Sequence, residues 1–342
     1  MPEPQHTEPQ PPWQQLAPLL DLATPMALRV AATLGLADLL ADGPRSADDL
    51  AKQAGADPDA LTRMLRLLVT HWVFTEPEPG RFALNGTAAL LRGDEPGGMR
   101  TRLDLGGFGG QMDLAFTGLL DTVRTGQPAW PQVFGAPLWE YLAANSGFGA
   151  SFDATMAAGS EYDTALADTY DWSALRLVAD VGGGTGTLLA AILTGNPGLR
   201  GLLIDLPETV QRGRAHFASA GLADRCEFAG QSFFDPLPPG ADAYLLCRVI
   251  QDWDDAAAAA ILRQCAQAAG QTGRVLVIES HGVSGGDPAA FAEMNLRMLV
   301  LTGGQERTID EYRALAAQAD LVLTEVQEAA PDTILEYRRQ RP

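Results

Sequence analysis

The sequence contains little of what disulfide-stabilised or metal-binding proteins need. Its 342 residues include three cysteines and four histidines. The cysteines, Cys226, Cys247 and Cys265, are odd in number and dispersed, which favours small buried thiols in a reducing compartment over disulfides. No histidine stands at ligand spacing from a cysteine or a carboxylate, so we expect no metal site.

Basic residues and long apolar runs are also scarce. Twenty-four Lys and Arg stand against 43 Asp and Glu, a formal net charge of −19. This charge repels phosphate backbones and anionic membranes, so nucleic acid is a poor candidate partner. The apolar runs fall far short of the roughly 20 residues that cross a bilayer, and residues 1–12 lack the basic and apolar segments of a signal peptide. We therefore expect a soluble, cytoplasmic protein with a disordered leader over residues 1–12.

The chain is long enough, and rich enough in apolar residues, to form about two domains. Apolar residues recur at helical spacing over 16–40, where a helix is expected. A capped helix over 46–54, a second helix over 59–70 and a hairpin near 79–82 follow in the order of a winged helix. The predicted division is a winged-helix-like domain over 13–105, a helical linker or substrate-covering region over 106–170 and an α/β domain over 171–342.

A winged helix can bind DNA, which is the rival interpretation of the first domain. The helix that would enter the groove carries only two arginines, Arg63 and Arg66, and the negative charge of the chain opposes binding. We therefore favour a dimerising or substrate-covering role.

Beyond Trp172, strands and helices alternate regularly. Strands are expected over 176–180, 201–205, 226–229, 241–247, 274–279, 321–328 and 333–337, and helices notably over 254–269, 289–301 and 309–319. Such alternation predicts an open α/β sheet whose ligand lies at the carboxyl ends of the strands.

The most informative stretch is LVADVGGGTGT at 177–187, which indicates a buried strand followed by a glycine turn that opens a helix. Glycine permits positive φ and lets a ligand approach amide N–H groups at a helix start. Asp205 ends the next apolar strand, at the distance of about 20 residues where doubly wound folds place an acid on a ribose. Together these features indicate a nucleoside-bearing cofactor, with a purely structural turn as the alternative.

Two cofactors suit a strand, a glycine turn and a ribose acid. Dinucleotide sites use G-x-G-x-x-G, whereas this chain has G-x-G-x-G at Gly182, Gly184 and Gly186. The tighter spacing, preceded by Asp180, favours S-adenosylmethionine. Its ammonium can meet an acid, and its carboxylate can meet backbone amides.

Several strings, in order, resemble the S-adenosylmethionine-dependent small-molecule O-methyltransferases. They are DVGGG (180–184), IDLPE (204–208), GQSFFDPLP (230–238), RVIQDWDD (248–255) and LRML (296–299). The middle of the chain is particularly similar to the anthracycline group, which includes carminomycin 4-O-methyltransferase and aclacinomycin 10-hydroxylase. The strings concerned are DLAFTGLLD (113–121), RTG (124–126), SFD (151–153) and YDWSA (170–174). The resemblance runs from about Leu16 to the end, and it implies a dimerisation domain, a Rossmann-like class I methyltransferase domain and an aromatic substrate between them.

The resemblance also implies which residues bind the cofactor. Gly182 and Gly184 would face its methionine part, Asp205 would hold the ribose hydroxyls, and Ser232 and Phe233 would lie beside adenine. Ser232 replaces the carboxylate that relatives have. The full cofactor set is Asp180, Gly182, Gly184, Asp205, Leu206, Ser232, Phe233 and Cys247, with core packing as the alternative for Phe233 and Cys247.

The second departure from the family is Gln251, which stands where many members have a general-base histidine. A glutamine side chain exchanges hydrogen bonds but takes no proton near neutral pH, so its role would be to orient. The anthracycline group also lacks this histidine. His281, after the fifth strand, is a possible substitute base, with a solvated loop residue as the alternative. Asn295 stands where relatives often have an acid.

A flat aromatic substrate needs apolar walls, and four residues are candidates: Trp130, Trp253, Met294 and Met298. Ordinary core packing is the alternative for each. The sequence thus predicts a homodimeric O-methyltransferase that methylates a phenolic hydroxyl of an aromatic polyketide mainly by proximity and orientation. The alternative is a homologue that binds the cofactor without methylating, as a decarboxylase or hydroxylase of anthracycline type.

Overall fold

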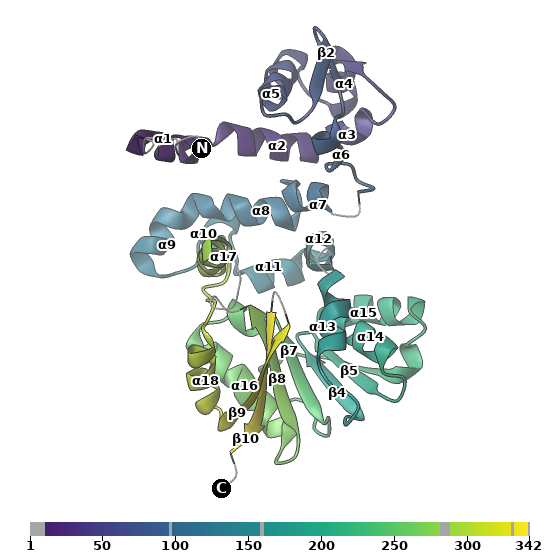
Figure 1. The fold of residues 1–342 in the computed structure, drawn as a ribbon, viewed down its shortest axis with the longest axis vertical. Helices are drawn as coiled ribbons and strands as arrows, with labels where there is room; N and C mark the ends of the chain where they lie inside the picture. The colour runs from purple at the N-terminus through teal and green to yellow at the C-terminus, as the bar shows by residue number, and fades with distance from the viewer. Residues whose placement is uncertain (1–10, 96–97, 158–160, 281–287, 330–331, 341–342) are drawn as a thin grey trace, which may run out of the picture. The chain divides into compact units, whose positions relative to one another are not determined.

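A computed structural model describes residues 11–95, 98–157, 161–280, 288–329 and 332–340. The chain divides into two compact units, Met1–Gln111 and Met112–Pro342, each with a hydrophobic core of its own (Figure 1). Among the described helices, none combines the length and the apolar character needed to cross a bilayer.

The first unit joins short helices to a small sheet. Leu50, Leu65 and Phe82 are fully buried in its core. The helices expected around 46–54 and 59–70 are present, and Ser46 and Asp57 cap them by accepting hydrogen bonds from the backbone N–H groups of Asp49 and Ala60. The antiparallel sheet has the order β1-β3-β2. The elements are α1 (Pro12–Leu16), η1 (Ala17–Leu20), α2 (Ala23–Thr33), α3 (Leu36–Leu39), β1 (Arg45–Ser46), α4 (Ala47–Ala54), α5 (Pro58–Thr70), β2 (Thr75–Glu78), β3 (Arg81–Ala83), α6 (Gly86–Ala89) and α7 (Met99–Leu103).

The single helix expected over 16–40 is wrong, because the structure breaks it twice. Asp21 has extended backbone angles, which end η1 before α2 begins. Gly35 has a φ of +63°, in the left-handed region that ends helices readily at glycine. The helical spacing of apolar residues therefore continues across both breaks, so the spacing alone did not reveal them.

The second unit is built on a seven-stranded sheet with the order β6-β5-β4-β7-β8-β10-β9. All pairs are parallel except those of β10, which runs antiparallel to both β8 and β9. The strands are β4 (Leu177–Val181), β5 (Arg200–Asp205), β6 (Cys226–Gly230), β7 (Ala243–Cys247), β8 (Arg274–Ser280), β9 (Leu321–Ala329) and β10 (Asp332–Arg339). All seven expected strands are confirmed, and so is the Rossmann-like fold class.

Helices cover both faces of this sheet. One face packs against α16 (Asp255–Ala269) and α18 (Ile309–Ala317). The other packs against α13 (Glu161–Thr169), α14 (Thr187–Gly195) and α15 (Pro207–Ser219). Two short 3₁₀ turns complete this part, η3 (Ala223–Arg225) and η4 (Ile250–Asp252). The apolar residues of the central parallel strands β4, β7 and β8 are thus shielded on both sides, as parallel sheets require.

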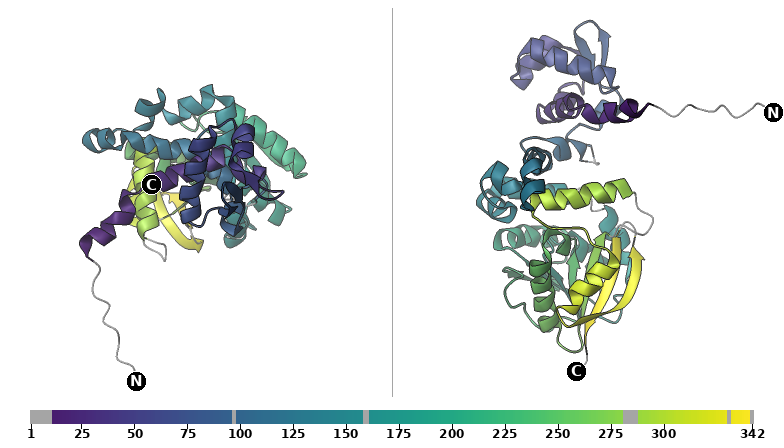
Figure 2. Two further views of the ribbon diagram at one scale, coloured as in Figure 1. Left: turned by 90° about the horizontal axis from the view of Figure 1, so that it is seen from above. Right: turned by 90° about the vertical axis from the view of Figure 1, so that its left-hand side faces the viewer.

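A helical group lies at the carboxyl ends of the strands (Figures 1 and 2). It contains α8 (Phe108–Leu114), η2 (Ala115–Gly118), α9 (Leu119–Thr125), α10 (Trp130–Phe134), α11 (Leu138–Ala144), α12 (Ser146–Ala157) and α17 (Pro288–Leu301). Residues distant in sequence join it: the backbone N–H of Ala129 donates to the carbonyl of Val300 at 2.9 Å, and Arg297 pairs with Asp113 at 2.9 Å.

The core of the second unit makes a direct stability prediction. Leu245 in β7 is fully buried, so Leu245→Ala leaves a cavity and should lower the free energy of unfolding by about 2–5 kcal/mol. Leu120→Ala is the matched control, because Leu120 is 62% exposed and should change it by less than about 0.5 kcal/mol. Chemical unfolding of both variants measures the difference, and equal losses would contradict the assignment of the core.

Candidate active site

The turn after β4 has a backbone that favours glycine. Gly182, Gly184 and Gly186 have φ values of +70°, +61° and +80°. A Cβ at Gly183 would lie 2.4 Å from the Asp180 carboxyl, and one at Gly186 would lie 2.5 Å from the ring of Phe217. The turn is therefore constrained by packing beneath it, whereas a Cβ at Gly184 would meet nothing within 4 Å.

Two carboxyl groups lie at this turn, on neighbouring strands. Asp205 ends β5 and accepts backbone N–H groups from Gly184 at 2.9 Å and from Leu206 at 2.7 Å. Burial raises the pKa of Asp205 to about 6. Asp180 in β4 is 1% exposed, and its Oδ1 has no hydrogen-bond partner among the described residues. Burial, reinforced by the charges of Asp205 and Asp163, raises the pKa of Asp180 to about 7.

The residues expected beside adenine lie next to the same turn. A Cβ at Gly182 would come within 3.3 Å of the ring of Phe233. Ser232 turns its hydroxyl to the local backbone, accepting the N–H of Phe234 at 3.2 Å. The rings of Phe233 and Trp253 meet edge to face, with centroids 5.8 Å apart.

Trp139 extends this aromatic group, although the sequence patterns did not reveal it. It lies on α11 and stacks on Trp253, with centroids 6.1 Å apart and planes 19° apart. Its indole N–H is buried and has no acceptor among the described residues. Stacking between residues so distant in sequence depends on the tertiary fold and leaves no local signal.

Cys247 ends β7 and is half-buried. Burial raises the pKa of its thiol well above the usual range, so the thiol stays neutral and weakly nucleophilic. The next residue, Arg248, has a φ of +55° and donates from Nε to Asp332 at 3.1 Å. This ion pair holds a strained turn between β7 and η4, the segment that carries Gln251.

Gln251 lies between two acids that sequence analysis missed. Its amide nitrogen can donate to Glu279 Oε2 and to Glu306 Oε1, both at 3.1 Å. The other oxygen of Glu279 accepts the backbone N–H groups of Val249, Ile250 and Gln251, the nearest at 2.8 Å. Glu279 lies near the carboxyl end of β8, so the rule that identified Asp205 at the end of β5 would have found it.

The charge on these acids is set by burial. Burial, followed by the charges of Glu306 and Asp252, raises the pKa of Glu279 well above its usual range. Burial raises the pKa of Glu306 to about 7 and that of Asp252 to about 8. Glu306 Oε2 is buried without a partner among the described residues. Near neutral pH the cluster therefore holds protons that ordinary carboxyl groups have lost.

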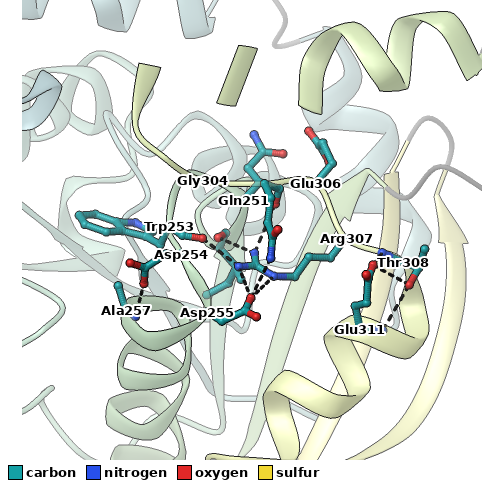
Figure 3. Close-up of polar contacts among 12 residues, drawn as sticks. Gln251, Trp253, Asp254, Asp255, Ala257, Gly304, Glu306, Arg307, Thr308 and Glu311 are labelled. Carbon is teal, nitrogen blue, oxygen red and sulfur yellow. Dashed lines mark hydrogen bonds and ion pairs between the residues drawn. The ribbon is translucent and has the colours of Figure 1, made fainter. Parts of the chain in front are cut away.

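Arg307 fixes the loop around this cluster (Figure 3). Its guanidinium, 1% exposed, donates to Asp255 at 2.8 Å and to the carbonyls of Trp253 at 2.9 Å and Ile250 at 3.2 Å. Figure 3 shows that the side chains of Gln251 and Glu306 point away from this ion pair. Asn295 on α17 accepts the backbone N–H of Glu306 at 3.0 Å and fixes it from the other side.

The remaining expected pocket residues lie on α10 and α17. Trp130 is fully buried beside Phe134, Tyr141 and Phe148, with centroids 4.3, 5.8 and 6.0 Å away. On α17, Met298 is 7% exposed and Met294 40% exposed. Their roles in substrate binding, like those of the cofactor residues, stay predictions. His281 lies outside the described residues.

The residues present fit a sulfonium nucleoside. The unpartnered carboxylate oxygen of Asp180 suits an ammonium, and the glycine turn leaves open space at Gly184, where a Cβ would meet nothing within 4 Å. Phe233 offers an aromatic ring beside the turn. No group of three or more potential metal ligands occurs among the described residues.

Comparison with known families gives matches over both units. A model of the O-methyltransferase domain matches residues 116–321, and a model of the O-methyltransferase dimerisation domain matches residues 18–93. The first match alone covers more than half of the chain and includes the glycine turn, Gln251, Glu279 and Glu306.

Individual relatives cover nearly the whole chain. A 2,7-dihydroxy-5-methyl-1-naphthoate 7-O-methyltransferase from Streptomyces carzinostaticus is 47% identical, over 90% of this chain and 92% of its own. Aclacinomycin 10-hydroxylase from Streptomyces purpurascens is 44% identical, over 92% and 85%. An O-methyltransferase from neocarzinostatin biosynthesis, solved with S-adenosylmethionine and 2-hydroxy-5-methyl naphthoic acid, superposes with a TM-score of 0.90 at 44% identity, over 94% of this chain and 98% of its own.

The buried acid beneath the glycine turn predicts a pH dependence of stability. Because folding raises the pKa of Asp180 from 3.8 to about 7, stability is greatest when Asp180 is protonated and falls as pH rises across that window. Asp180→Asn removes this fall, which is on the order of 4 kcal/mol. Unfolding at pH 5 and pH 8 should therefore show a smaller difference for the variant than for the wild type. Equal differences would show that Asp180 ionises normally in the folded protein.

Fold, site and relatives agree. The seven-stranded sheet carries a glycine turn and Asp205 at its carboxyl edge, and the O-methyltransferase domain model covers both. The resemblance inferred from the sequence strings is thereby confirmed, and the aclacinomycin 10-hydroxylase is among the relatives. The chain belongs to the O-methyltransferase family and is an S-adenosylmethionine-dependent methyltransferase.

Proposed function

We propose that the protein transfers the methyl group of S-adenosylmethionine to a phenolic hydroxyl of a hydroxynaphthoate or a similar polyketide-derived aromatic. The observation that carries this proposal is the position of Trp253. Its ring lies 5.8 Å from Phe233, beside the glycine turn, and 6.1 Å from Trp139 on α11. Cofactor and flat substrate would therefore share one aromatic wall. The naphthoate specificity of the relatives supports this choice of substrate.

The cofactor residues follow from the geometry of the carboxyl edge. When bound, S-adenosylmethionine supplies a methyl group on a positively charged sulfur. Asp205 would accept the ribose hydroxyls, and Phe233 would stack on adenine. The glycine turn at Gly182 and Gly184 would hold the methionine part, and Asp180 would meet its ammonium. Leu206, Ser232 and Cys247 would complete the walls.

Alignment would supply most of the rate. The sulfonium leaves as a neutral thioether, so the main requirement is an in-line approach of oxygen to the methyl carbon. Alignment of two reactants in a closed site contributes ~7–11 kcal/mol, whereas a general base typically contributes about 10²- to 10⁴-fold. Gln251 would orient the substrate without taking its proton. Trp139 and Trp253 would hold the aromatic plane.

The first unit would form the contact between two copies of the chain. The dimerisation model matches residues 18–93, and the helical start of the unit exposes Trp13, Leu16, Leu19, Leu20 and Leu22, each at least 55% accessible. Apolar surface of this extent favours burial in an interface. We therefore propose a homodimer with a winged-helix-like dimerisation domain, located in the cytoplasm.

The second candidate function is that of an enzyme that binds S-adenosylmethionine but does not transfer its methyl group. It is favoured by the identity to aclacinomycin 10-hydroxylase and by the amides Gln251 and Asn295, which stand where relatives often have ionisable groups. Such an enzyme would convert its substrate and leave S-adenosylmethionine intact.

One assay separates the two functions. Purified protein is incubated with S-adenosylmethionine and 2-hydroxy-5-methyl naphthoic acid, 1,4-dihydroxy-2-naphthoic acid or an anthracycline carboxylic acid. We expect S-adenosylhomocysteine and a methyl ether in equal amounts with at least one naphthoate. Substrate conversion without S-adenosylhomocysteine would favour the hydroxylase, and no conversion of any of the three would contradict the proposed substrate class.

The assignment of Asp205 makes a separate prediction for binding. Asp205→Ala removes a charged acceptor of the ribose hydroxyls, a loss of ~1.5–3 kcal/mol, so S-adenosylhomocysteine should bind about 10- to 100-fold more weakly. Asp224→Ala, in the exposed turn η3, is the matched control and should bind normally. Isothermal titration calorimetry measures both. An unchanged affinity of the Asp205 variant would place the nucleoside elsewhere.

A further inference from the structure

We propose that Glu306 accepts the phenolic proton during methyl transfer and so replaces the general base that is missing at Gln251. This inference rests on the proposed function and adds a catalytic residue to it. When the aryl oxygen forms its bond to the methyl carbon, the bond from that carbon to sulfur breaks and sulfur keeps the electron pair. The proton of the hydroxyl passes to the Glu306 carboxylate, which later releases it to solvent.

The two acids beside Gln251 differ in how far their oxygens are already hydrogen-bonded. Glu279 Oε1 accepts three backbone N–H groups, and its Oε2 faces the Gln251 amide. Glu279 is therefore fully engaged in holding the turn after β7. Glu306 receives the same amide on Oε1, while its Oε2 is buried without a partner among the described residues.

An unsatisfied buried acceptor is costly, and a donor from a ligand removes that cost. A phenolic O–H is such a donor, and Glu306 lies beside Gln251, which by the sequence resemblance stands where many family members have a general-base histidine. Of the two acids beside Gln251, Glu306 is therefore the one whose carboxyl group keeps an oxygen available to a ligand.

The surroundings of Glu306 also adjust its proton affinity to this task. Among the described residues, charged or titratable groups approach it from several elements: Asp252 on η4, Glu279 on β8, Asp332 on β10, Tyr312 on α18 and the adjacent Arg307. Burial, then the charge of Asp332, raises the pKa of Glu306 to about 7, and Arg307 opposes this rise. A base is most effective when its pKa lies near the working pH.

The position of Glu306 is also fixed on both sides. Its backbone N–H donates to Asn295 Oδ1 at 3.0 Å. The next residue, Arg307, ties the loop to Asp255 and to two carbonyls of the 250–253 segment. In Figure 3 the Glu306 side chain lies on the side of this loop that Gln251 occupies, away from the guanidinium. The acid therefore keeps its orientation without a salt bridge that would neutralise it.

The experiment compares Glu306→Gln with the wild type and with Glu325→Gln, a control on the exposed strand β9. The wild type must first form S-adenosylhomocysteine with a naphthoate, because its inactivity would refute the proposed function and not the role of Glu306. With an ordinary phenol at pH 8, Glu306→Gln should lose about 10²- to 10⁴-fold in kcat, and Glu325→Gln should lose nothing. Affinity for S-adenosylhomocysteine should be unchanged in all three proteins, which also shows that they are folded.

The pH dependence of kcat tests whether Glu306 acts in its ionised form. In the wild type, kcat should rise with pH through about 7 as Glu306 ionises, and Glu306→Gln should lack this rise. Glu306→Asp, which keeps a carboxylate, should retain it at a lower rate. Nitro-substituted hydroxynaphthoates, whose phenols ionise unaided, should reduce the loss in Glu306→Gln to less than about tenfold. A variant that keeps both the wild-type rate and its pH profile would overturn the proposal.

Absorbance gives a readout without turnover. At a pH just below the phenol's own pKa, a nitro-substituted hydroxynaphthoate bound to the protein with S-adenosylhomocysteine should pass its proton to the Glu306 carboxylate in the wild type and show the phenolate band. In Glu306→Gln the bound ligand should keep the protonation of the free phenol. An identical phenolate fraction in both proteins would show that Glu306 takes no proton from the ligand and would also overturn the proposal.

Discussion

The packing of the Asp180 carboxyl beneath Gly183 constrains the rest of the site. A Cβ at Gly183 would lie 2.4 Å from that carboxyl, so the turn can cross the end of β4 only as glycine, and its neighbours take φ values that other residues rarely adopt. Because β5 pairs in parallel with β4, Asp205 reaches the same turn and accepts the N–H of Gly184. The turn and Asp205 are therefore one structure, held together by packing and by this hydrogen bond.

Carboxyl groups with raised pKa values gather at this edge of the sheet, and the ligand chemistry explains why that is useful. Asp180, Asp205, Glu279 and Glu306 are all acids whose pKa burial raises. A sulfonium cofactor brings a positive charge that favours their ionised forms, and transfer of its methyl group removes that charge while releasing a proton. Acids that titrate near neutral pH can respond to both changes. In the proposed function, the aromatic rings of Phe233, Trp253 and Trp139 would line one side of this exchange.

Sequence patterns predicted the parts of this arrangement that local rules determine. Strand periodicity placed all seven strands, and the glycine spacing with Asp205 indicated the cofactor, because each signal lies within a short stretch. Glu306 and Trp139 escaped because their roles depend on contacts with Gln251 and Trp253, which the fold brings near. Glu279 was missed although it lies near a strand end, as Asp205 does. The helix expected over 16–40 failed because periodicity does not show where a left-handed glycine, Gly35, ends a helix.

The central claim is that cofactor and phenol meet at the carboxyl edge of this sheet, between the glycine turn and Glu306. A crystal structure with S-adenosylhomocysteine and a hydroxynaphthoate tests it most directly. The account predicts the ribose hydroxyls on Asp205, adenine against Phe233 and the acceptor hydroxyl within hydrogen-bonding distance of Glu306 Oε2. A nucleoside bound away from the glycine turn, or a substrate hydroxyl remote from both Gln251 and Glu306, would contradict it.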